Sequence, residues 1–416
     1  MYRNYYILPI GHILMHKMVK RESYLGRIRP FYNSDLIKVL MGMRRSGKTV
    51  LLNQIREELI MSGVPEDNIV YVNFEDMDHS HIRTGAALNE FSKRYRNGAK
   101  YYFMFDEIQK VTGFEEGINS IRVNMECSIF VTGSNGKLLS GDLATTLTGR
   151  TISFTIMPFT FKEVAEYRRL NGMEEKDFFE YLKWGGLPQR LQQNDDLSVR
   201  VYLESVYGDI VYNDIIMRSK SRDADLMERI VDFLMDNSGK VFSSSSVAEY
   251  IEKTEKRQVS TETVYNYVKH INSSMMINKL ERFDIKGKMF LSTLQKYYAA
   301  DPGLVNVRRT DGSMDIGARI ETIVHNELLS RNYRLGMGKI GDKEVDFIAE
   351  KNGKKYYFQV CYLMADEKTR EREFSALESI DDNHPKFVVS MDQADMSGRG
   401  IEHLRLVDDL LLSDRF

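Results

Sequence analysis

Residues 35–49 read Asp-Leu-Ile-Lys-Val-Leu-Met-Gly-Met-Arg-Arg-Ser-Gly-Lys-Thr, and this stretch decides the fold of the first part of the chain. The apolar run at residues 35–41 predicts a short β-strand, and the helical spacing of apolar residues over 50–61 predicts a helix. Gly63 and Pro65 end that helix. The two glycines between strand and helix allow a tight turn whose backbone N–H groups point inward. Strand, glycine-bounded loop and helix are the context that a phosphate-binding loop requires.

The loop at residues 42–49 offers the chemistry that a nucleoside triphosphate needs, because several negative charges must be held in a small space. Inward N–H groups and the positive end of the following helix favour phosphate oxygens. We expect the Lys48 ammonium to reach the β- and γ-phosphates and the Thr49 hydroxyl to bind Mg²⁺. The alternative is a glycine turn without a ligand, which the surrounding strand and helix disfavour. The predicted nucleotide-binding residues in the loop are Gly42, Met43, Arg44, Arg45, Ser46, Gly47, Lys48 and Thr49.

Four further apolar runs predict strands, at residues 69–74, 101–105, 128–132 and 151–156. Helical spacers separate them. Continuous apolar strands of this kind are typical of a parallel sheet that helices cover on both faces. The strands end in polar residues at their C-terminal edge, where ligands bind in open α/β sheets. The predicted fold class of this part is therefore α/β, with a P-loop NTPase core.

The strand at residues 101–105 ends at an acidic pair, Asp106-Glu107. A carboxylate at this position can hold Mg²⁺ through water, and we expect Asp106 to do so. A neighbouring carboxylate can polarise the attacking water as a general base, and we expect Glu107 to do so. The alternative is an ordinary acidic strand end. The loop upstream favours the functional interpretation.

Four other polar residues near strand ends are weaker candidates. Thr132 or Asn135 is placed to contact the γ-phosphate or the attacking water, and Asn73 is placed to hold Glu107 in an inactive pose. Arg150 is a candidate arginine finger, a catalytic cation supplied to a neighbouring subunit. A purely structural role stays open for each of them.

Beyond residue 160 the sequence becomes helical, interrupted by Gly-Gly-Leu-Pro at 185–188. Helices are predicted at 226–235, 246–251 and 260–271, the second opened by a serine run suited to N-capping. Strands at 279–285 and 289–291 follow, joined by Lys-Gly-Lys. Three helices and a hairpin in this order resemble a winged helix-turn-helix. Residues 316–416 predict a last α/β unit, with a helix over 316–329 and a hairpin around 351–353.

The motifs together resemble a known family. Residues 42–49, Phe-Glu-Asp at 74–76, Phe-Asp-Glu-Ile-Gln at 105–109, Thr-Gly-Ser-Asn at 132–135 and Leu-Thr-Gly-Arg at 147–150 are similar to those of prokaryotic AAA-type P-loop ATPases. Members of that family carry a C-terminal domain with a restriction-endonuclease-like fold. The resemblance implies four segments: an N-terminal extension at 1–20, an ATPase core at 21–160, a helical lid and winged helix at 161–300, and an endonuclease-like domain at 301–416.

The last segment departs from the pattern that nucleases of this fold need, which is a helix acid, a hairpin aspartate and Glu-x-Lys on the next strand. Glu321 and Asp346 match the first two requirements. Gln359 stands at the expected Glu and Cys361 at the expected Lys. Lys355 is about 13 Å from Gln359 at strand rise, too far to replace the lysine. We therefore expect a degenerate domain that binds but does not cut.

The winged-helix segment offers a basic surface, with Lys253, Lys256, Arg257, Lys269 and His270 around its third helix. Such a helix is suited to reading DNA. A structural role as a lid is the stronger interpretation, because Glu252, Glu255 and Glu262 dilute the positive field. DNA and a protein partner are both possible, as is a homo-oligomer.

The composition narrows the class of protein. The 416 residues suggest two to three domains, and 42% hydrophobic with 28% charged residues are ordinary for a globular protein. A net charge of −2 gives no global attraction to nucleic acid. Two distant cysteines argue against a disulfide framework, and no apolar stretch is long enough for a bilayer. We expect a cytoplasmic protein without membrane contact.

The sequence thus predicts an ATP-binding, Mg²⁺-dependent ATPase that acts as a motor or conformational switch. The alternative is a nucleic-acid-binding regulator in which ATP mainly sets conformation. An ATP-dependent nuclease is the third and weakest hypothesis.

Overall fold

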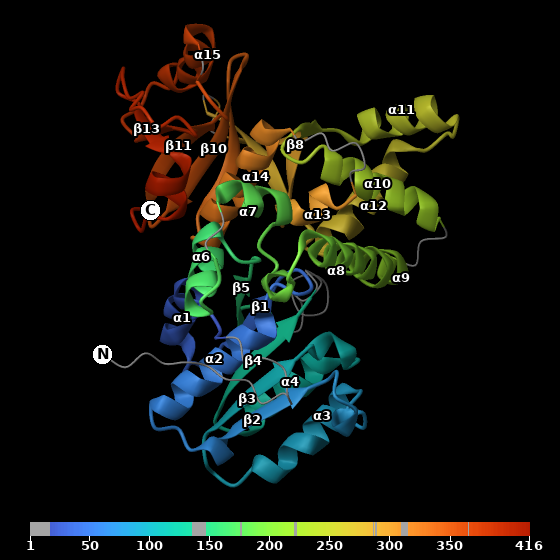
Figure 1. The fold of residues 1–416 in the computed structure, drawn as a ribbon. Helices are drawn as coiled ribbons and strands as arrows, with labels where there is room; N and C mark the ends of the chain where they lie inside the picture. Colours follow the sequence, from blue (N-terminus) through green and yellow to red (C-terminus); the bar gives the residue numbers. More distant parts are fainter. Residues whose placement is uncertain are drawn as a thin grey trace. The chain divides into compact units, whose positions relative to one another are not determined.

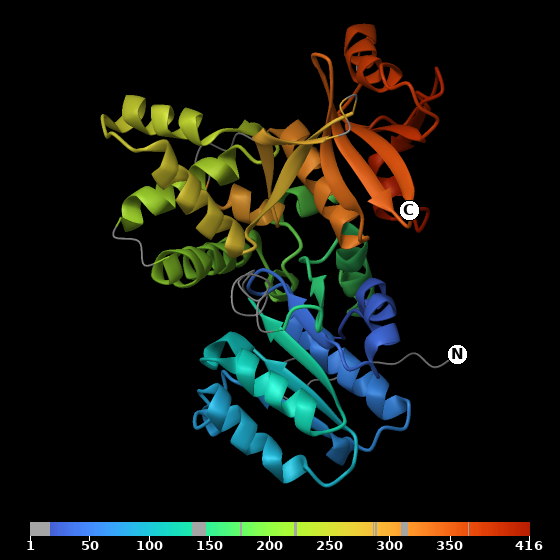
Figure 2. The ribbon, with the colours of Figure 1, turned by 180° about the vertical axis from the view of Figure 1, so that it is seen from behind.

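A computed structural model describes residues 17–134, 147–174, 177–219, 223–285, 287, 289–308, 315–364 and 366–416. The chain divides into two compact units (Figures 1 and 2). Unit 1 contains the residues up to Met157 together with Leu170–Gly172, and unit 2 contains Pro158–Arg169 and Met173–Phe416.

Unit 1 is built on a five-stranded sheet in which every pair of neighbouring strands is parallel, as the sequence predicted. The strand order is β2-β3-β4-β1-β5. The strands are β1 (Ile37–Met41), β2 (Ile69–Asn73), β3 (Tyr101–Asp106), β4 (Cys127–Gly133) and β5 (Thr151–Thr155). Because β4 lies between β1 and β3, its carboxyl end lies between the strand that leads into the glycine loop and the strand that ends at the acidic pair.

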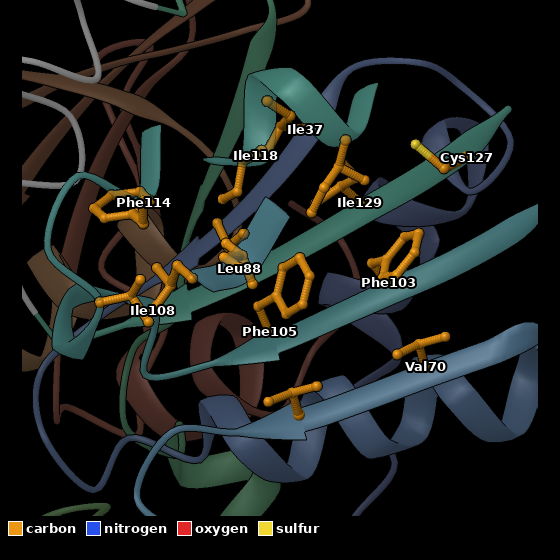
Figure 3. Close-up of a cluster of buried hydrophobic side chains, with 14 of the residues drawn as sticks. Ile37, Val70, Leu88, Phe103, Phe105, Ile108, Phe114, Ile118, Cys127 and Ile129 are labelled. Atoms are coloured by element: carbon orange, nitrogen blue, oxygen red, sulfur yellow. The ribbon is translucent and has the colours of Figure 1, made fainter. Parts of the chain in front are cut away.

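Helices cover both faces of this sheet. One face packs on α3 (Gly85–Ser92) and α4 (Phe114–Asn124), and the other on α1 (Glu22–Ile28) and α2 (Lys48–Met61). Strand alternation assigns the side chains: Phe103 and Phe105 point into the first core, and Tyr102 and Met104 into the second. Figure 3 shows the first core, where Phe103 and Phe105 lie beside Leu88 and Ile129. Burial on both faces explains why these strands read as unbroken apolar runs.

Unit 2 combines helices with an eight-stranded sheet of order β13-β12-β11-β10-β9-β7-β8-β6. The strands are β6 (Val241–Phe242), β7 (Ile277–Asp284), β8 (Met289–Ala299), β9 (Arg334–Ile340), β10 (Lys343–Lys351), β11 (Lys354–Val360), β12 (Lys386–Ser390) and β13 (Glu402–Arg405). The predicted hairpin around residues 351–353 joins β10 to β11. β7 pairs in parallel with β9, so the hairpin of the predicted winged helix belongs to the same sheet as the C-terminal strands.

The described helices of unit 2 begin at side-chain caps in most cases. The predicted serine cap is present: Ser243 accepts a hydrogen bond from the N–H of Ser246 at the start of α11. The helices are α6 (Phe161–Leu170), α7 (Phe178–Trp184), α8 (Asp196–Asp209), α9 (Met217–Ser219), α10 (Ala224–Asp236), α11 (Ser244–Glu255), α12 (Thr261–Ser273), α13 (Pro302–Asn306), α14 (Ile316–Ser330) and α15 (Glu367–Glu378). Among the helices that the structure describes, none has the length and apolarity to cross a membrane.

The Gly-Gly-Leu-Pro stretch is fixed by a buried carboxylate. Asp301 accepts hydrogen bonds from the N–H groups of Gly186 at 2.7 Å and Gly303 at 2.9 Å. Gly185 has φ +71°, and a Cβ there would lie 1.9 Å from Asp301 Oδ1. This contact ties α7 to α13 across more than a hundred residues of sequence, on the two sides of the predicted segment border at 300/301.

Candidate functional site

The glycine-bounded loop lies between the carboxyl end of β1 and the start of α2. Its first glycine, Gly42, packs closely against the backbone of Ile156, and a Cβ there would lie only 2.2 Å from Ile156 O. Arg45 and Gly47 have φ values of 67° and 94°, in the left-handed region. The loop therefore takes a turn that needs glycine at both ends, as the sequence predicted.

Lys48 begins α2, and its ammonium group lies over the loop. Its Nζ donates hydrogen bonds to Gly42 O at 3.0 Å and Met43 O at 3.1 Å, and the side chain is buried. Thr49 is exposed beside it. Ser46 Oγ is buried, and within the described part of the chain it has no hydrogen-bond partner. A buried cation and an unpaired hydroxyl in one loop are groups that an anionic ligand satisfies.

A residue outside the motif supports this loop. Arg21, which is buried just before α1, donates from Nη1 to Ser46 O at 3.1 Å and to Met157 O at 2.9 Å. Its backbone N–H donates to Gln54 Oε1 at 3.2 Å. Arg21 thus links the loop to α2 and to the end of the sheet. Sequence reasoning missed it, because nothing in the local sequence distinguishes it from neighbouring basic residues.

Asp106 is fully buried at the carboxyl end of β3. One carboxylate oxygen accepts a hydrogen bond from Thr132 Oγ1, and the other accepts one from the Tyr71 hydroxyl at 3.1 Å. Burial raises the pKa of Tyr71 well above its usual value, and the Asp106 carboxylate adds to this effect. Tyr71 therefore stays protonated and keeps donating to Asp106.

Glu107 has φ +54°, an uncommon backbone conformation for a residue other than glycine. Its N–H donates to Thr132 Oγ1 at 3.0 Å, and its carboxylate accepts a hydrogen bond from Gln109 Nε2. Asn73, the predicted holder of Glu107, instead accepts a hydrogen bond from the N–H of Glu75 at 2.8 Å. The amide that contacts Glu107 in this structure therefore belongs to Gln109.

Of the other residues predicted for the site in unit 1, Thr132 lies near the loop strand and Arg150 lies at the opposite end of the sheet. Thr132 on β4 pairs in register with Leu40 on β1, the strand that leads into the loop. Asp106 on β3 lies one strand further from β1. Arg150 is exposed at the amino end of β5, where its carbonyl accepts from the Ile37 N–H at 2.8 Å. That end of the sheet is opposite the loop, about 15 Å away along five residues of strand. Asn135 lies outside the described residues.

Unit 2 brings the predicted acids Glu321 and Asp346 together around a cation. Lys296 Nζ on β8 lies 2.7 Å from Glu321 Oε1 on α14 and 3.4 Å from Asp346 Oδ1 on β10. Gln359 on β11 accepts a hydrogen bond from the Asp346 backbone N–H at 3.4 Å, and its amide donates to Glu373 Oε2 at 3.0 Å. Cys361 is buried, which raises the pKa of its thiol to about 12. A lysine is thus present after all, but it comes from β8.

The sequence did not predict Lys296, because the pattern expects the lysine on the strand that carries Gln359. The available signal was weak: a lysine at residue 296 inside the apolar and aromatic run before Ala299. Lys355, which is too far along the strand from Gln359 to replace the lysine, lies 3.8 Å from Glu350 on the neighbouring strand. Among the described residues, it makes no contact with the cluster.

Comparison with known proteins identifies the domains that the chain matches and two of its relatives. Residues 34–165 match a family model described as an AAA domain, and residues 175–313 match one described as a domain of unknown function (DUF8612). The chain is 34% identical over 402 residues to an uncharacterized protein of Haemophilus influenzae, covering 95% of this chain and 99% of that protein. It is 30% identical over 359 residues to the uncharacterized protein MJ1544 of Methanocaldococcus jannaschii, covering 82% and 78%. The chain therefore belongs to one family with these two proteins, and its residues 34–165 form an AAA domain.

Solved structures add only a weak similarity to this AAA-domain chain. The Aeropyrum pernix ORC1 protein in complex with DNA is 12% identical, with 75% of this chain and 94% of that chain covered and a TM-score of 0.30. AMPPCP-bound DnaA from Aquifex aeolicus is 13% identical, with 61% and 89% covered and a TM-score of 0.30. Similarity at this level supports no argument about fold or function.

The residues of the AAA domain fit a magnesium-bound nucleoside triphosphate. A Cβ on Gly42 would fill the space inside the loop, and Lys48 supplies a buried cation. Ser46 Oγ has no hydrogen-bond partner among the described residues and can donate to a ligand. Thr49 and Asp106 supply the hydroxyl and carboxylate oxygens that Mg²⁺ prefers.

Proposed function

We propose that the AAA domain binds ATP with Mg²⁺ and hydrolyses it. One observation carries the proposal: a single hydroxyl, Thr132 Oγ1, forms hydrogen bonds with both Asp106 and Glu107. Thr132 lies on β4, which pairs with the strand that leads into the loop, β1. A general base needs a defined position relative to the phosphate, and this hydrogen bond provides one.

The residues of the site have distinct roles in this proposal. The Lys48 ammonium leaves the Gly42 and Met43 carbonyls and binds the β- and γ-phosphates. Thr49 and Asp106 would hold the magnesium ion, which would neutralise charge on the phosphates. Glu107 accepts a proton from the attacking water. Tyr71 holds the Asp106 carboxylate in place from the side opposite Thr132.

The test is a steady-state ATPase assay of Glu107→Gln beside wild type. The variant should bind ATP normally and lose turnover, because the amide cannot accept the proton. Glu116→Gln, an exposed residue of α4, is the matched control and should keep the wild-type rate. A folded Glu107→Gln protein that hydrolyses ATP at the wild-type rate would remove Glu107 from this role.

We further propose that nucleotide state changes unit 2, so that the protein acts as a motor or switch. The Glu107→Gln protein provides the comparison, because it holds ATP without turnover. Hydrogen exchange of residues 158–416 should differ between its ATP-bound and ADP-bound forms. Identical exchange in the two forms would leave a simple ATPase without a switch. A cytoplasmic location and self-assembly remain predictions.

A nucleic-acid-binding regulator is the second candidate. The order α10, α11, α12, β7 and β8 is that of a winged helix, and Tyr265, Asn266 and Lys269 are exposed on α12. The opposing observation is charge pairing: Lys253 lies 2.6 Å from Glu249, and Arg257 pairs with Asp223. Duplex DNA that binds with a strong salt dependence and stimulates the ATPase would favour this candidate. Stimulation by a protein alone would favour a signalling role.

A further inference from the structure

A charge cluster in unit 2 joins three elements that lie far apart in sequence. Lys296 comes from β8, Glu321 from α14 and Asp346 from β10, and their side chains are only 7%, 16% and 11% exposed. Moving three charges out of water is costly unless they compensate one another. The cluster is therefore held by the attraction between its own members.

The ammonium of Lys296 occupies the centre of the cluster. It lies 2.7 Å from Glu321 Oε1 and 3.4 Å from Asp346 Oδ1. Other donors hold the carboxylates from outside: Tyr298 donates its hydroxyl proton to Glu321 Oε1 at 2.6 Å, and the Val360 N–H donates to Asp346 Oδ2 at 2.9 Å. Both acids are thus oriented toward a single central cation.

A divalent metal would need the same oxygens. Mg²⁺ binds carboxylate oxygens at about 2.0–2.1 Å, so it cannot share Glu321 Oε1 with an ammonium group at hydrogen-bond distance without strong repulsion between cations. Among the described residues, no group of three or more His, Cys, Asp or Glu side chains is arranged to hold a metal ion. The ammonium and a metal are alternatives at this place.

We propose that Lys296 is an internal cation that takes the place of a divalent metal between Glu321 and Asp346, and that its removal opens a metal site. The cluster then holds β8 to α14 and β10 without a metal. The two carboxylates, Glu321 and Asp346, are ligands of the type that Mn²⁺ and Mg²⁺ accept. This inference concerns unit 2 and does not depend on ATP hydrolysis by the AAA domain.

The test measures Mn²⁺ uptake by the nucleotide-free full chain, using electron paramagnetic resonance of free Mn²⁺. Lys296→Met replaces the ammonium by an apolar group of similar length. It should take up about one Mn²⁺ more per chain than wild type, because two buried carboxylates then lack a counter-ion. Lys296→Met with Asp346→Asn should lose that extra ion. Lys279→Met, on the neighbouring strand β7, is the matched control and should behave as wild type.

Two results would overturn the proposal. One is a folded Lys296→Met protein that takes up no additional Mn²⁺. The other is wild-type uptake that falls when Asp346→Asn is introduced alone, since a metal would then coexist with the ammonium group. The comparison of wild type with Asp346→Asn needs no change at Lys296. It therefore tests whether Lys296 excludes a metal even if Lys296→Met does not fold. Equal uptake by wild type and Asp346→Asn supports the exclusion of metal by Lys296.

Discussion

The backbone N–H of Glu107 donates a hydrogen bond to Thr132 Oγ1 at 3.0 Å, and the same hydroxyl donates to the carboxylate of Asp106. One side chain of β4 therefore positions two acidic residues of β3. Since β4 also pairs with β1, the hydroxyl connects the acidic pair to the strand that leads into the phosphate loop.

Replacing Thr132 by Val should lower the rate of ATP hydrolysis by about 10–100-fold, which is typical when a group that orients a metal ligand is lost. ATP affinity should change little, because the loop and Lys48 are untouched. The kcat and KM of the variant give the measurement. Thr132→Ser keeps the hydroxyl and is the control. A Val variant with wild-type kcat would show that this hydrogen bond has no role in turnover.

Gln109 holds the Glu107 carboxylate in this structure, and we expect it to restrain the base. A hydrogen bond to a charged group contributes about 1.5–3 kcal/mol, so Gln109→Leu should raise the basal hydrolysis rate by about 10–100-fold. Stopped-flow release of phosphate would measure it. A lower rate in the variant would mean that Gln109 instead aims Glu107 at the water.

Much of the fold was predictable from local sequence. The strand predicted at 128–132 is observed as Cys127–Gly133, and the helix predicted at 316–329 is observed as Ile316–Ser330. Apolar runs and helical periodicity depend on burial over a few neighbouring residues, which the sequence displays directly. The acidic pair and the loop were found in the same way, because each is a short motif at a strand end.

Contacts between distant segments were not predictable. Lys296 and Glu321 meet only because β7 and β8 join the sheet of β9 and β10, and no local pattern fixes that register. The turn after β3, where Glu107 takes φ +54°, brings the Gln109 amide to the Glu107 carboxylate. The sequence gives no sign of this backbone conformation. The pairing of Arg21 with Ser46 O likewise depends on where α1 packs.

Arg150 lies at the edge of its sheet opposite the loop, with Nη1 3.1 Å from Asn119 Oδ1. If it acts as an arginine finger, it must act on a second copy of the chain. Arg150→Ala and Glu107→Gln should each be slow alone, and a mixture should recover part of the wild-type rate, because a Glu107→Gln subunit lends its arginine to an intact base. The same total protein of each variant alone is the control. No recovery on mixing contradicts a shared site.

Lys38 is buried in β1, where Nζ donates to Ser128 Oγ at 2.7 Å. Burial lowers the pKa of Lys38 to about 7. Between that value and its ordinary pKa, the unfolded chain binds a proton that the folded chain does not, so stability should rise with pH across this window.

Lys38→Met should therefore stabilise the protein at about pH 6, by an amount on the order of a few kcal/mol, and the gain should shrink toward about pH 10. Urea unfolding of both proteins across this range is the measurement. Lys93→Met, at an exposed position, is the control. A Met variant that is less stable than wild type at low pH would mean that the hydrogen bonds of Lys38 outweigh its burial.

The claim that matters most is that residues 42–49 bind a triphosphate. Isothermal titration of the folded wild-type protein with ATP and Mg²⁺ should show saturable binding of about one nucleotide per chain. Lys48→Ala, shown to be folded by circular dichroism, should bind far more weakly because the ammonium is gone. A folded wild-type protein that takes up neither ATP nor GTP with Mg²⁺ would contradict the account.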